Sequence, residues 1–232
     1  FGKNCLFYSS RVGRQSSWNL PIAVVVDHAF KPGEPTIKTD CPDWCRNACI
    51  AACPTRALKG NSRIDPRRCI SFLSYFGQGI TPRELREPMG LYVYGCDRCQ
   101  NVCPRNQPWL SNDLPMNEKV VAKADSFNLV SLLHMDKAYF EAKIWPHMFY
   151  MSYNDIWRWR MNVARVMGNS RDTQYIPELE RAFHENTDER VRAMAVWAID
   201  HIGGDSAKKA LADIILKGDD SPMVKEELAL VL

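Results

Sequence analysis

The sequence predicts a mainly helical protein, with some β-structure only at its N-terminal edge. The first observation is that eight of the nine cysteines lie between residues 41 and 103. The second is that apolar residues recur at helical spacing from Ser126 onward. Clustered cysteines in a chain without a visible secretory signal more often hold metal than form disulfides. We therefore expect a metal-bound domain over residues 41–125 and a helical region over 126–232.

The composition is that of a water-soluble globular protein. Of the 232 residues, 46% are apolar and 25% are charged, and the net charge is +3. No apolar run approaches the roughly 18 residues of a membrane helix, and no secretory signal is visible. We therefore expect a cytoplasmic protein without a membrane partner. The chain starts at Phe1 rather than at a methionine, and we expect it to be a fragment of a longer protein.

The charge is divided unevenly along the chain. Residues 1–154 carry 19 Lys and Arg against 13 Asp and Glu, whereas residues 155–232 carry 11 against 14. This division favours two units rather than one.

Two short strands are expected before the first cysteine run. Residues 5–10 and 22–27 are apolar or aromatic, and a connection rich in Gly, Arg and Ser separates them. The Pro/Gly-rich residues 31–35 end the second strand. Two strands alone make an incomplete sheet. Cys5 falls on the first strand, where we expect a free thiol that packs as a small hydrophobe.

The cysteine spacing predicts iron-sulfur clusters rather than zinc or disulfides. The first run holds Cys41, Cys45, Cys49 and Cys53, the second holds Cys96, Cys99 and Cys103, and both end in Cys-x3-Cys-Pro. That ending is typical of the bacterial ferredoxin run, in which the fourth cysteine binds the other cluster. Two [4Fe-4S] clusters need eight thiolates, and Cys69 completes that number. We therefore expect a ferredoxin-like double [4Fe-4S] cluster domain.

Two other uses of these cysteines are disfavoured. Cys96-x2-Cys99 alone would serve as half of a zinc site, but the Cys-Pro endings argue against zinc. The odd total of nine cysteines argues against a closed set of disulfides.

The spacers around Cys45 depart from the ferredoxin pattern. Ferredoxin runs have two-residue spacers where Cys41, Cys45 and Cys49 are separated by three residues. The loop must therefore bulge. Alternatively, one of Cys41 and Cys45 is a spectator and the cluster is a three-iron or labile form.

Local signals beyond the first run predict short helices. Asp65-Pro66 starts a helix that leads into Cys69, and Thr81-Pro82-Arg83-Glu84 forms a capping box before a helix that stops near Pro88. Residues 104–118 are rich in Pro and Asn and are expected to form a linker.

The last part of the chain predicts paired-helix repeats. One helical face over residues 156–167 carries Ile156, Trp159, Val163, Val166 and Met167. A similar pattern returns about 33 residues later from Arg190 and again from Val224, and a second apolar helix follows each of the first two copies. These are HEAT-like helical repeats with a slightly short period. Two and a half repeats cannot close a core alone, so we expect them to dock on the cluster domain or to continue.

Aromatic and cationic residues near the first repeat have two interpretations. The aromatic residues either stack on bases or pack in a core, which is commoner at helical spacing: they are Trp145, Phe149, Tyr150, Tyr153, Trp157 and Trp159. Arg158, Arg160 and Arg165 either contact nucleic-acid phosphates or form a solvated face. Core packing and a solvated face are the favoured interpretations.

These motifs together resemble the C-terminal part of epoxyqueuosine reductases, cobalamin-dependent enzymes of tRNA queuosine synthesis that are akin to corrinoid reductive dehalogenases. The likeness rests on Gly2-Lys3-Asn4, Ser17-Trp18, Cys49-Ile50-Ala51-Ala52-Cys53-Pro54-Thr55, Arg68-Cys69-Ile70-Ser71, Tyr94-Gly95-Cys96-Asp97, Cys103-Pro104 with Asn106, Asn162 and Gly168-Asn169. The resemblance implies one cluster on Cys41, Cys45, Cys49 and Cys103 and the other on Cys53, Cys69, Cys96 and Cys99. It places cobalamin and the catalytic acid in an upstream domain, of which residues 1–40 would be the trailing strands.

The first functional hypothesis is an electron-transfer module. Its two clusters would take single electrons from a donor such as a ferredoxin or flavodoxin and deliver them to a corrinoid or another redox centre. The alternatives are a full-length parent that is a true tRNA epoxyqueuosine reductase, with tRNA as a partner, or a helical-repeat scaffold with structural clusters. The fragment alone is not expected to be catalytic.

Overall fold

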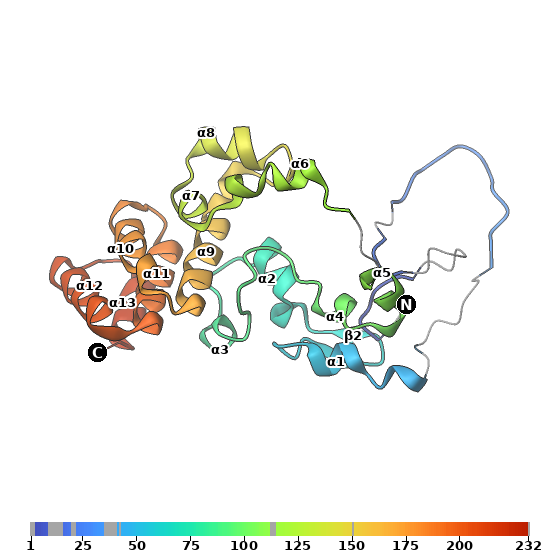
Figure 1. The fold of residues 1–232 in the computed structure, drawn as a ribbon, viewed down its shortest axis with the longest axis horizontal. Coiled ribbons are helices and arrows are strands. Elements are labelled where there is room, and N and C mark those ends of the chain that lie inside the picture. Colours follow the sequence, from blue (N-terminus) through green and yellow to red (C-terminus); the bar gives the residue numbers. More distant parts are fainter. Residues whose placement is uncertain are drawn as a thin grey trace. The chain divides into compact units, whose positions relative to one another are not determined.

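The computed structural model describes residues 3–8, 16–19, 22–34, 41, 43–111, 115–149 and 151–231 (Figure 1). The described chain is mainly helical, as predicted. It divides into two compact units. The cysteine unit comprises residues 1–69 and 96–115, and the repeat unit comprises residues 70–95 and 116–232. The predicted domain bounds stay a prediction, but residues 70–95 pack with the repeats rather than with the cysteines that flank them.

The cysteine unit is built from short elements joined by turns. They are the 3-10 helices η1 (Asp43–Cys45), η2 (Pro66–Arg68) and η3 (Pro104–Asn106), the α-helices α1 (Ala48–Ala52), α4 (Arg98–Asn101) and α5 (Gln107–Leu110), and the strands β1 (Leu58–Gly60) and β2 (Arg63–Ile64). The strands form an antiparallel hairpin whose turn residues, Asn61 and Ser62, have φ of 49° and 53°. Two consecutive positive φ values are the mark of a tight hairpin turn. α1 packs against α4 and β1, so the two cysteine runs lie side by side.

No strand forms in the described residues before Cys41, where the sequence predicted two. A strand needs a hydrogen-bonded neighbour, and residues 22–34 find none among the described residues; the side chain of Val25 is 99% exposed. Residues 9–10 of the first predicted strand lie outside the described residues. Cys5 is not on a strand but in a turn, with φ of 65°. The assignment of residues 1–40 to an upstream domain remains a prediction.

The repeat unit contains the predicted helix pairs. α9 (Ile156–Ser170) is followed by α10 (Ile176–Glu185), α11 (Glu189–Ile202) by α12 (Gly204–Lys217), and α13 (Pro222–Ala229) begins a third copy. The shorter elements are α2 (Ile70–Phe76), α3 (Arg83–Arg86), α6 (Glu118–Val121), η4 (Ala124–Phe127), α7 (Leu129–His134), α8 (Lys137–Tyr139), the π-helix η5 (Phe140–Ile144), η6 (Tyr153–Asp155) and η7 (Thr173–Tyr175). α11 packs against α9, α10, α12 and α13, so it is the central helix of this unit. No helix among the described residues is both long and apolar enough to cross a membrane.

Several helix starts follow from local side-chain chemistry. The carboxylate or amide oxygen of Asn128, Asp136 and Asp188 accepts a backbone N–H in the first turn of α7, α8 and α11. Asp65 does the same for η2, which confirms the predicted start at Asp65-Pro66, although the α-helix itself begins at Ile70.

Two local predictions were wrong. The capping box at Thr81 does not form, because Pro82 is the N-cap of α3 and Thr81 is buried. The Thr81 carbonyl instead accepts a hydrogen bond of 2.8 Å from Nε of Arg86. The expected linker over residues 104–118 is helical in its first half, where η3 and α5 follow Cys103 directly.

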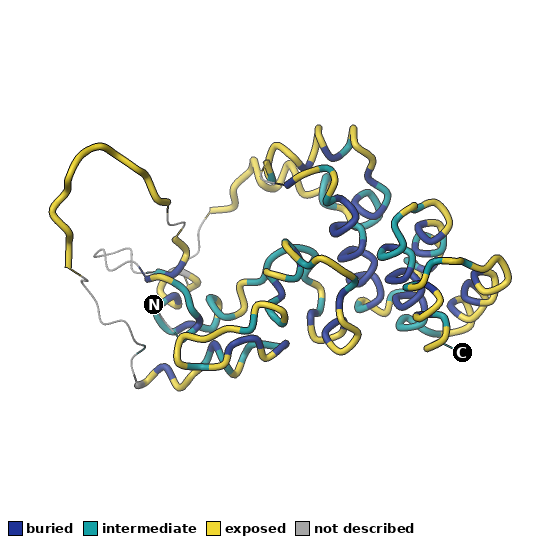
Figure 2. The backbone as a smooth tube through the Cα atoms, turned by 180° about the vertical axis from the view of Figure 1, so that it is seen from behind, coloured by how far each residue is buried: buried dark blue, intermediate teal, exposed yellow. Residues whose placement is uncertain are grey.

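α9 and α11 form the centre of the hydrophobic core of the repeat unit, and both are buried along most of their length (Figure 2). The two helices approach each other at Gly168. A Cβ atom at that position would lie 2.9 Å from Cα of Ala198, closer than side chains normally allow. The Gly168-Asn169 motif therefore includes a glycine that the helix crossing requires.

α9 also carries a row of polar side chains, here called the donor row, at i, i+4, i+7 and i+11. Nε of Arg158 donates to the carbonyl of Gly77 (2.8 Å), Nδ2 of Asn162 to that of Ser74 (3.4 Å), Nη1 of Arg165 to that of Gly90 (2.7 Å), and Nδ2 of Asn169 to those of Arg86 (2.8 Å) and Gly90 (2.9 Å). Arg165 also binds the carbonyl of Tyr92. The donor row thus holds residues 74–92 on α9 through backbone carbonyls.

A buried ion pair holds α3 to α13. Oε1 of Glu227 lies 2.5 Å from Nη2 of Arg86, and Oε2 lies 2.7 Å from Nη1 of Arg83. The guanidinium of Arg86 also lies over the ring of Trp197 on α11. Removing one partner of a buried pair leaves an uncompensated charge. We therefore expect this contact to hold α13, the first helix of the third repeat, in place against α3.

Replacing Arg165 with Ala tests the donor row. Burial lowers the pKa of the Arg165 guanidinium to about 10, so the side chain stays charged at neutral pH. We expect the free energy of unfolding to fall by about 2–4 kcal/mol, because the carbonyl of Tyr92 loses this donor and the carbonyl of Gly90 loses one of its two. Urea denaturation measures the change. The matched control is Arg181→Ala, whose half-exposed pair with Glu178 should contribute within about 0.5 kcal/mol. Equal effects of the two variants would contradict the proposed role of the row.

Candidate metal centre

None of the nine cysteines is part of a disulfide. Cys41, Cys45 and Cys49 lie along the stretch from η1 into α1, and Cys103 precedes η3. Cys53 ends α1, Cys69 ends η2, and Cys96 and Cys99 lie at the start of α4. The eight predicted ligands therefore lie in or near short elements of one compact unit.

One group of thiols surrounds Cys49. Burial and, after it, the nearby Cys45, Cys41 and Cys103 together raise the pKa of Cys49 to about 11. Burial and Cys45 likewise raise the pKa of Cys41, against the backbone N–H of Lys3, which lowers it. The structure thus brings Cys41, Cys45 and Cys49 of the first run close to Cys103 of the second run.

A second group surrounds Cys99. Burial and, after it, the nearby Cys96, Cys49, Cys69 and Cys53 together raise the pKa of Cys99 to about 12. The pKa of Cys96 is raised by burial and by Cys69 and Cys53. Cys53, from the first run, therefore lies with the three cysteines from further along the chain. Cys49 of the first group contributes to the pKa of Cys99, so the two groups adjoin.

Backbone and hydroxyl donors point at several of these sulfurs. The N–H of Lys3 lies 3.2 Å from Sγ of Cys41, and the N–H of Ala57 lies 3.2 Å from Sγ of Cys53. Burial alone would raise the pKa of Cys53, but N–H groups of Leu58 and Ala57 and the Thr55 hydroxyl lower it overall. Hydrogen bonds of this kind stabilise a thiolate, the form that binds iron.

The spacer after Cys45 is accommodated by a left-handed turn. Arg46 and Asn47 have φ of 50° and 59°. Nζ of Lys3 donates to Oδ1 of Asn47 (2.9 Å), which braces the turn from outside the run. The expected bulge is therefore present, and Cys45 is buried beside Cys49 rather than turned to solvent.

A second brace joins residues 16–19 to the end of the second run. Oδ1 of Asn106 accepts the N–H of Ser17 (3.0 Å), and Nδ2 of Asn106 donates to the Ser17 hydroxyl (2.7 Å) and the Gln100 carbonyl (2.9 Å). Asn106 is fully buried. The motif residues Ser17 and Asn106 therefore support the Cys99–Cys103 loop through hydrogen bonds.

The donor set fits iron-sulfur clusters. No three Cys, His, Asp or Glu side chains of the described residues are grouped closely enough to hold a single metal ion. Thiolates on one zinc ion lie within roughly 4 Å of each other, because each Zn–S bond is about 2.3 Å. A [4Fe-4S] cluster instead binds each thiolate to a different iron, so two groups of four more widely spaced thiols suit it better.

The sequence interpretation of the arginines was wrong for two of the three. Arg158 and Arg165 are neither phosphate contacts nor a solvated face, because both are buried in the donor row. Arg160 is partly buried and donates to the carbonyl of Met135. Arg158 also pairs with Asp155 at 2.9 Å. Helical spacing alone did not distinguish these side chains from exposed ones.

The aromatic stretch divides between core and surface. Trp157 and Trp159 are buried, which confirms core packing for these two residues. Trp145 and Phe149 are 48% and 70% exposed, so core packing was wrong for them. Tyr150 lies outside the described residues.

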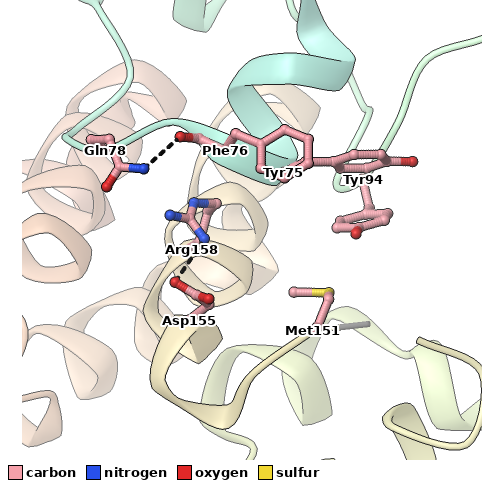
Figure 3. Close-up of a pocket in the computed structure, with 7 residues that line it drawn as sticks. All are labelled: Tyr75, Phe76, Gln78, Tyr94, Met151, Asp155 and Arg158. Carbon is pink, nitrogen blue, oxygen red and sulfur yellow. Dashed lines mark hydrogen bonds and ion pairs between the residues drawn. The ribbon is translucent and has the colours of Figure 1, made fainter. Parts of the chain in front are cut away.

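Sequence reasoning missed a pocket in the repeat unit (Figure 3). Its volume is about 190 Å³, and it is lined by Tyr75, Phe76, Gln78, Tyr94, Met151, Asp155 and Arg158. Tyr75 stacks on Tyr94 with 3.9 Å between ring centroids, and Tyr94 stacks on Trp159 at 5.0 Å. Gly95 allows this stack, because a Cβ there would lie 3.0 Å from the Tyr75 hydroxyl. The Tyr94-Gly95 pair of the sequence motif was the signal in the sequence for this aromatic stack.

Comparison with known proteins agrees with this geometry. Residues 41–106 match the 4Fe-4S double cluster binding domain, and residues 154–232 match HEAT repeats. The chain is 31% identical over 215 residues to an epoxyqueuosine reductase of Staphylococcus aureus, covering 89% of this chain and 52% of that protein. The repeats and the iron-sulfur segment predicted from the sequence are thereby confirmed.

Solved structures give the same result. An epoxyqueuosine reductase crystallised with a tRNA-Tyr stem loop modified with epoxyqueuosine has a TM-score of 0.69 and 27% identity, covering 87% of this chain and 53% of that one. The Streptococcus thermophilus enzyme shares the fold over 99% of this chain and 58% of its own, with a TM-score of 0.73 and 24% identity. The chain spans about half the length of the relatives it matches. Over most of its length it is therefore similar to epoxyqueuosine reductases, with their combination of an iron-sulfur segment and HEAT-like repeats.

Proposed function

We propose that this chain is the iron-sulfur part of an epoxyqueuosine reductase that acts on tRNA. The observation that carries the proposal is the pair of adjoining four-thiol groups within residues 41–103, in a segment that matches a double cluster binding domain. Of the hypotheses left open by the sequence, the similar proteins favour a tRNA epoxyqueuosine reductase over a module for an unspecified corrinoid partner. A purely structural role for the clusters is the remaining alternative.

The ligand sets that we propose are crossed between the two runs. Cys41, Cys45, Cys49 and Cys103 would hold one [4Fe-4S] cluster, and Cys53, Cys69, Cys96 and Cys99 the other. The support is that Cys103 lies with the first run and Cys53 with the second. Proline after each of these cysteines turns the chain away from its own run. When bound, such clusters take up and release single electrons.

Substituting cysteines tests the crossing. We expect the anaerobically reconstituted protein to bind about eight irons. Cys103→Ala should remove iron from the cluster of the first run, and Cys53→Ala from that of the second, each detected by iron analysis and electron paramagnetic resonance. Because cluster binding is coupled to folding, each loss should also loosen the other cluster.

Cys5→Ala is the matched control and should leave iron content unchanged. Cys5 is a demanding control, because burial and the nearby Cys69 thiolate raise its pKa. Loss of iron from the Cys5 variant, with full iron in the Cys103 variant, would contradict the proposed ligand sets.

The proposed reaction needs two electrons, and two clusters that each carry one electron can supply them. An epoxide loses its oxygen as water when it takes up two electrons and two protons, and leaves an alkene. The full-length protein, given epoxyqueuosine-containing tRNA and a strong reductant without oxygen, should yield a nucleoside lighter by one oxygen atom in mass spectrometry. A protein with full, redox-active clusters and no such product would contradict the proposed reductase. Clusters that accept no electrons would favour the structural role.

Cobalamin has no assigned place in the described residues. The pocket beside Tyr75 holds about 190 Å³, less than the roughly 300–1,000 Å³ of sites for ordinary small ligands. A corrinoid is larger than such ligands, so this pocket does not fit it. The electron path proposed for this chain therefore ends at its clusters.

An exposed basic hairpin is the site that we propose for an electron donor. The four exposed cations Arg56, Lys59, Arg63 and Arg67 lie on or beside β1 and β2. In the sequence the hairpin follows Cys53 and precedes Cys69, and both cysteines are proposed ligands of one cluster. A positive surface next to a cluster suits an acidic carrier such as a flavodoxin.

Reversing two of these charges tests the docking site. Lys59→Glu with Arg63→Glu should slow reduction by flavodoxin roughly tenfold at low salt and weaken its salt dependence. Stopped-flow absorbance measures the rate. Reduction by dithionite should be unchanged, and Lys208→Glu, an exposed charge in the repeat unit, should have no effect. Full reduction rates with weaker tRNA binding would assign the hairpin to tRNA instead.

A further inference from the structure

Residues 3–8 supply two hydrogen-bond donors to the sulfurs of the first thiol group. The N–H of Lys3 lies 3.2 Å from Sγ of Cys41, and the hydroxyl of Tyr8 lies 3.0 Å from Sγ of Cys103. Tyr8, Asn4 and Cys103 are all buried. The guanidinium of Arg105 also lies over the Tyr8 ring, 5.1 Å from its centroid.

The direction of the hydrogen bond between Tyr8 and Cys103 follows from Asn4. The N–H of Leu6 can only donate, so the Asn4 atom that it meets at 3.1 Å is the amide oxygen. The amide nitrogen therefore faces Tyr8, at 3.2 Å from its hydroxyl oxygen. An amide nitrogen has no free acceptor pair, so the Tyr8 oxygen accepts from Asn4. The Tyr8 hydrogen is then left for the sulfur of Cys103.

We propose that Tyr8, oriented by Asn4, is a positioning residue that donates a hydrogen bond to the Cys103 thiolate and raises the reduction potential of the cluster that Cys103 binds. Reduction adds negative charge to a cluster and its sulfurs, and a hydrogen-bond donor stabilises that charge. A tyrosine hydroxyl, with an ordinary pKa near 10, keeps its proton at neutral pH. The inference rests on the proposed ligand sets.

The contacts of Lys3 and Asn4 explain the presence of these two residues in the motif Gly2-Lys3-Asn4. Lys3 contributes its backbone N–H to Cys41 and its ammonium to the turn at Asn47, whereas Asn4 contributes its side chain to Tyr8. The segment thus acts on both runs of cysteines, since Cys41 and Cys103 are 62 positions apart in the chain.

The test uses the complete protein with its clusters. Tyr8→Phe removes one hydroxyl and keeps the ring. Tyr139→Phe is the matched control, because the Tyr139 hydroxyl donates to the backbone carbonyl of Ser126 in the repeat unit. In a redox titration followed by electron paramagnetic resonance, Tyr8→Phe should lower the midpoint potential of one cluster and leave the other unchanged. Pulsed resonance in D2O should lose one exchangeable deuteron coupled to that cluster. The control should change neither reading.

A second variant keeps Tyr8 but turns its hydroxyl hydrogen away from the Cys103 sulfur. It tests the role of Tyr8 even if Tyr8→Phe loses iron. Asn4→Asp presents a carboxylate, which accepts the Tyr8 hydrogen in place of the sulfur, so the same potential should fall. Asn47→Asp adds the same charge near the same thiol group without touching Tyr8, and its effect should be smaller.

The outcomes separate this inference from the proposed function. Unchanged potentials in Tyr8→Phe with full iron would overturn the role of Tyr8 and leave the clusters in place. Equal shifts in Asn4→Asp and Asn47→Asp would also overturn it. A wild-type protein without redox-active clusters would overturn the proposed function and this inference together.

Discussion

The repeat unit depends on the burial of charged and amide donors within a helix that is otherwise apolar. The donor row of α9 satisfies the carbonyls of residues 74–92, a stretch that has only two short helices of its own. Buried carbonyls without donors are costly, so this irregular stretch can lie against the core only where donors meet it. The stretch runs between Cys69 and Cys96, so the donor row fixes the segment through which the chain leaves the cysteine unit and returns to it.

The cysteine unit has the opposite problem, because it has little apolar core of its own. Its elements are short, and eight half-buried or buried thiols lie together in it. Burial and mutual repulsion raise the pKa of Cys49 and Cys99. Ionising these thiols without iron is therefore unfavourable, and cluster binding supplies the positive charge that stabilises the thiolates. The hydrogen bonds from Lys3, Ala57 and Tyr8 act in the same direction on single sulfurs.

These two constraints explain why the motif residues are so widely scattered. Asn162 and Asn169 belong to the donor row, and Gly168 belongs to the crossing of α9 and α11. Ser17 and Asn106 brace the second cysteine run, and Asn4 orients Tyr8. None of these residues is a proposed cluster ligand. Their common property is that a buried polar group needs its partner in one orientation, which tolerates few substitutions.

The sequence by itself determined the parts of this protein whose signals are local. The Cys-x3-Cys-Pro endings predict the iron-sulfur segment, and the recurring apolar positions of α9 and α11 predict the repeats, because ligand spacing and helical periodicity are written within a few residues. Only the tertiary structure decided where Arg158 and Arg165 lie, since their carbonyl partners are more than 70 positions away. It also decided that Tyr8 meets Cys103, 95 positions along the chain. A helical pattern predicts that polar side chains are exposed and apolar ones buried. Whether a charged side chain can be buried depends on distant backbone groups that only folding brings to it.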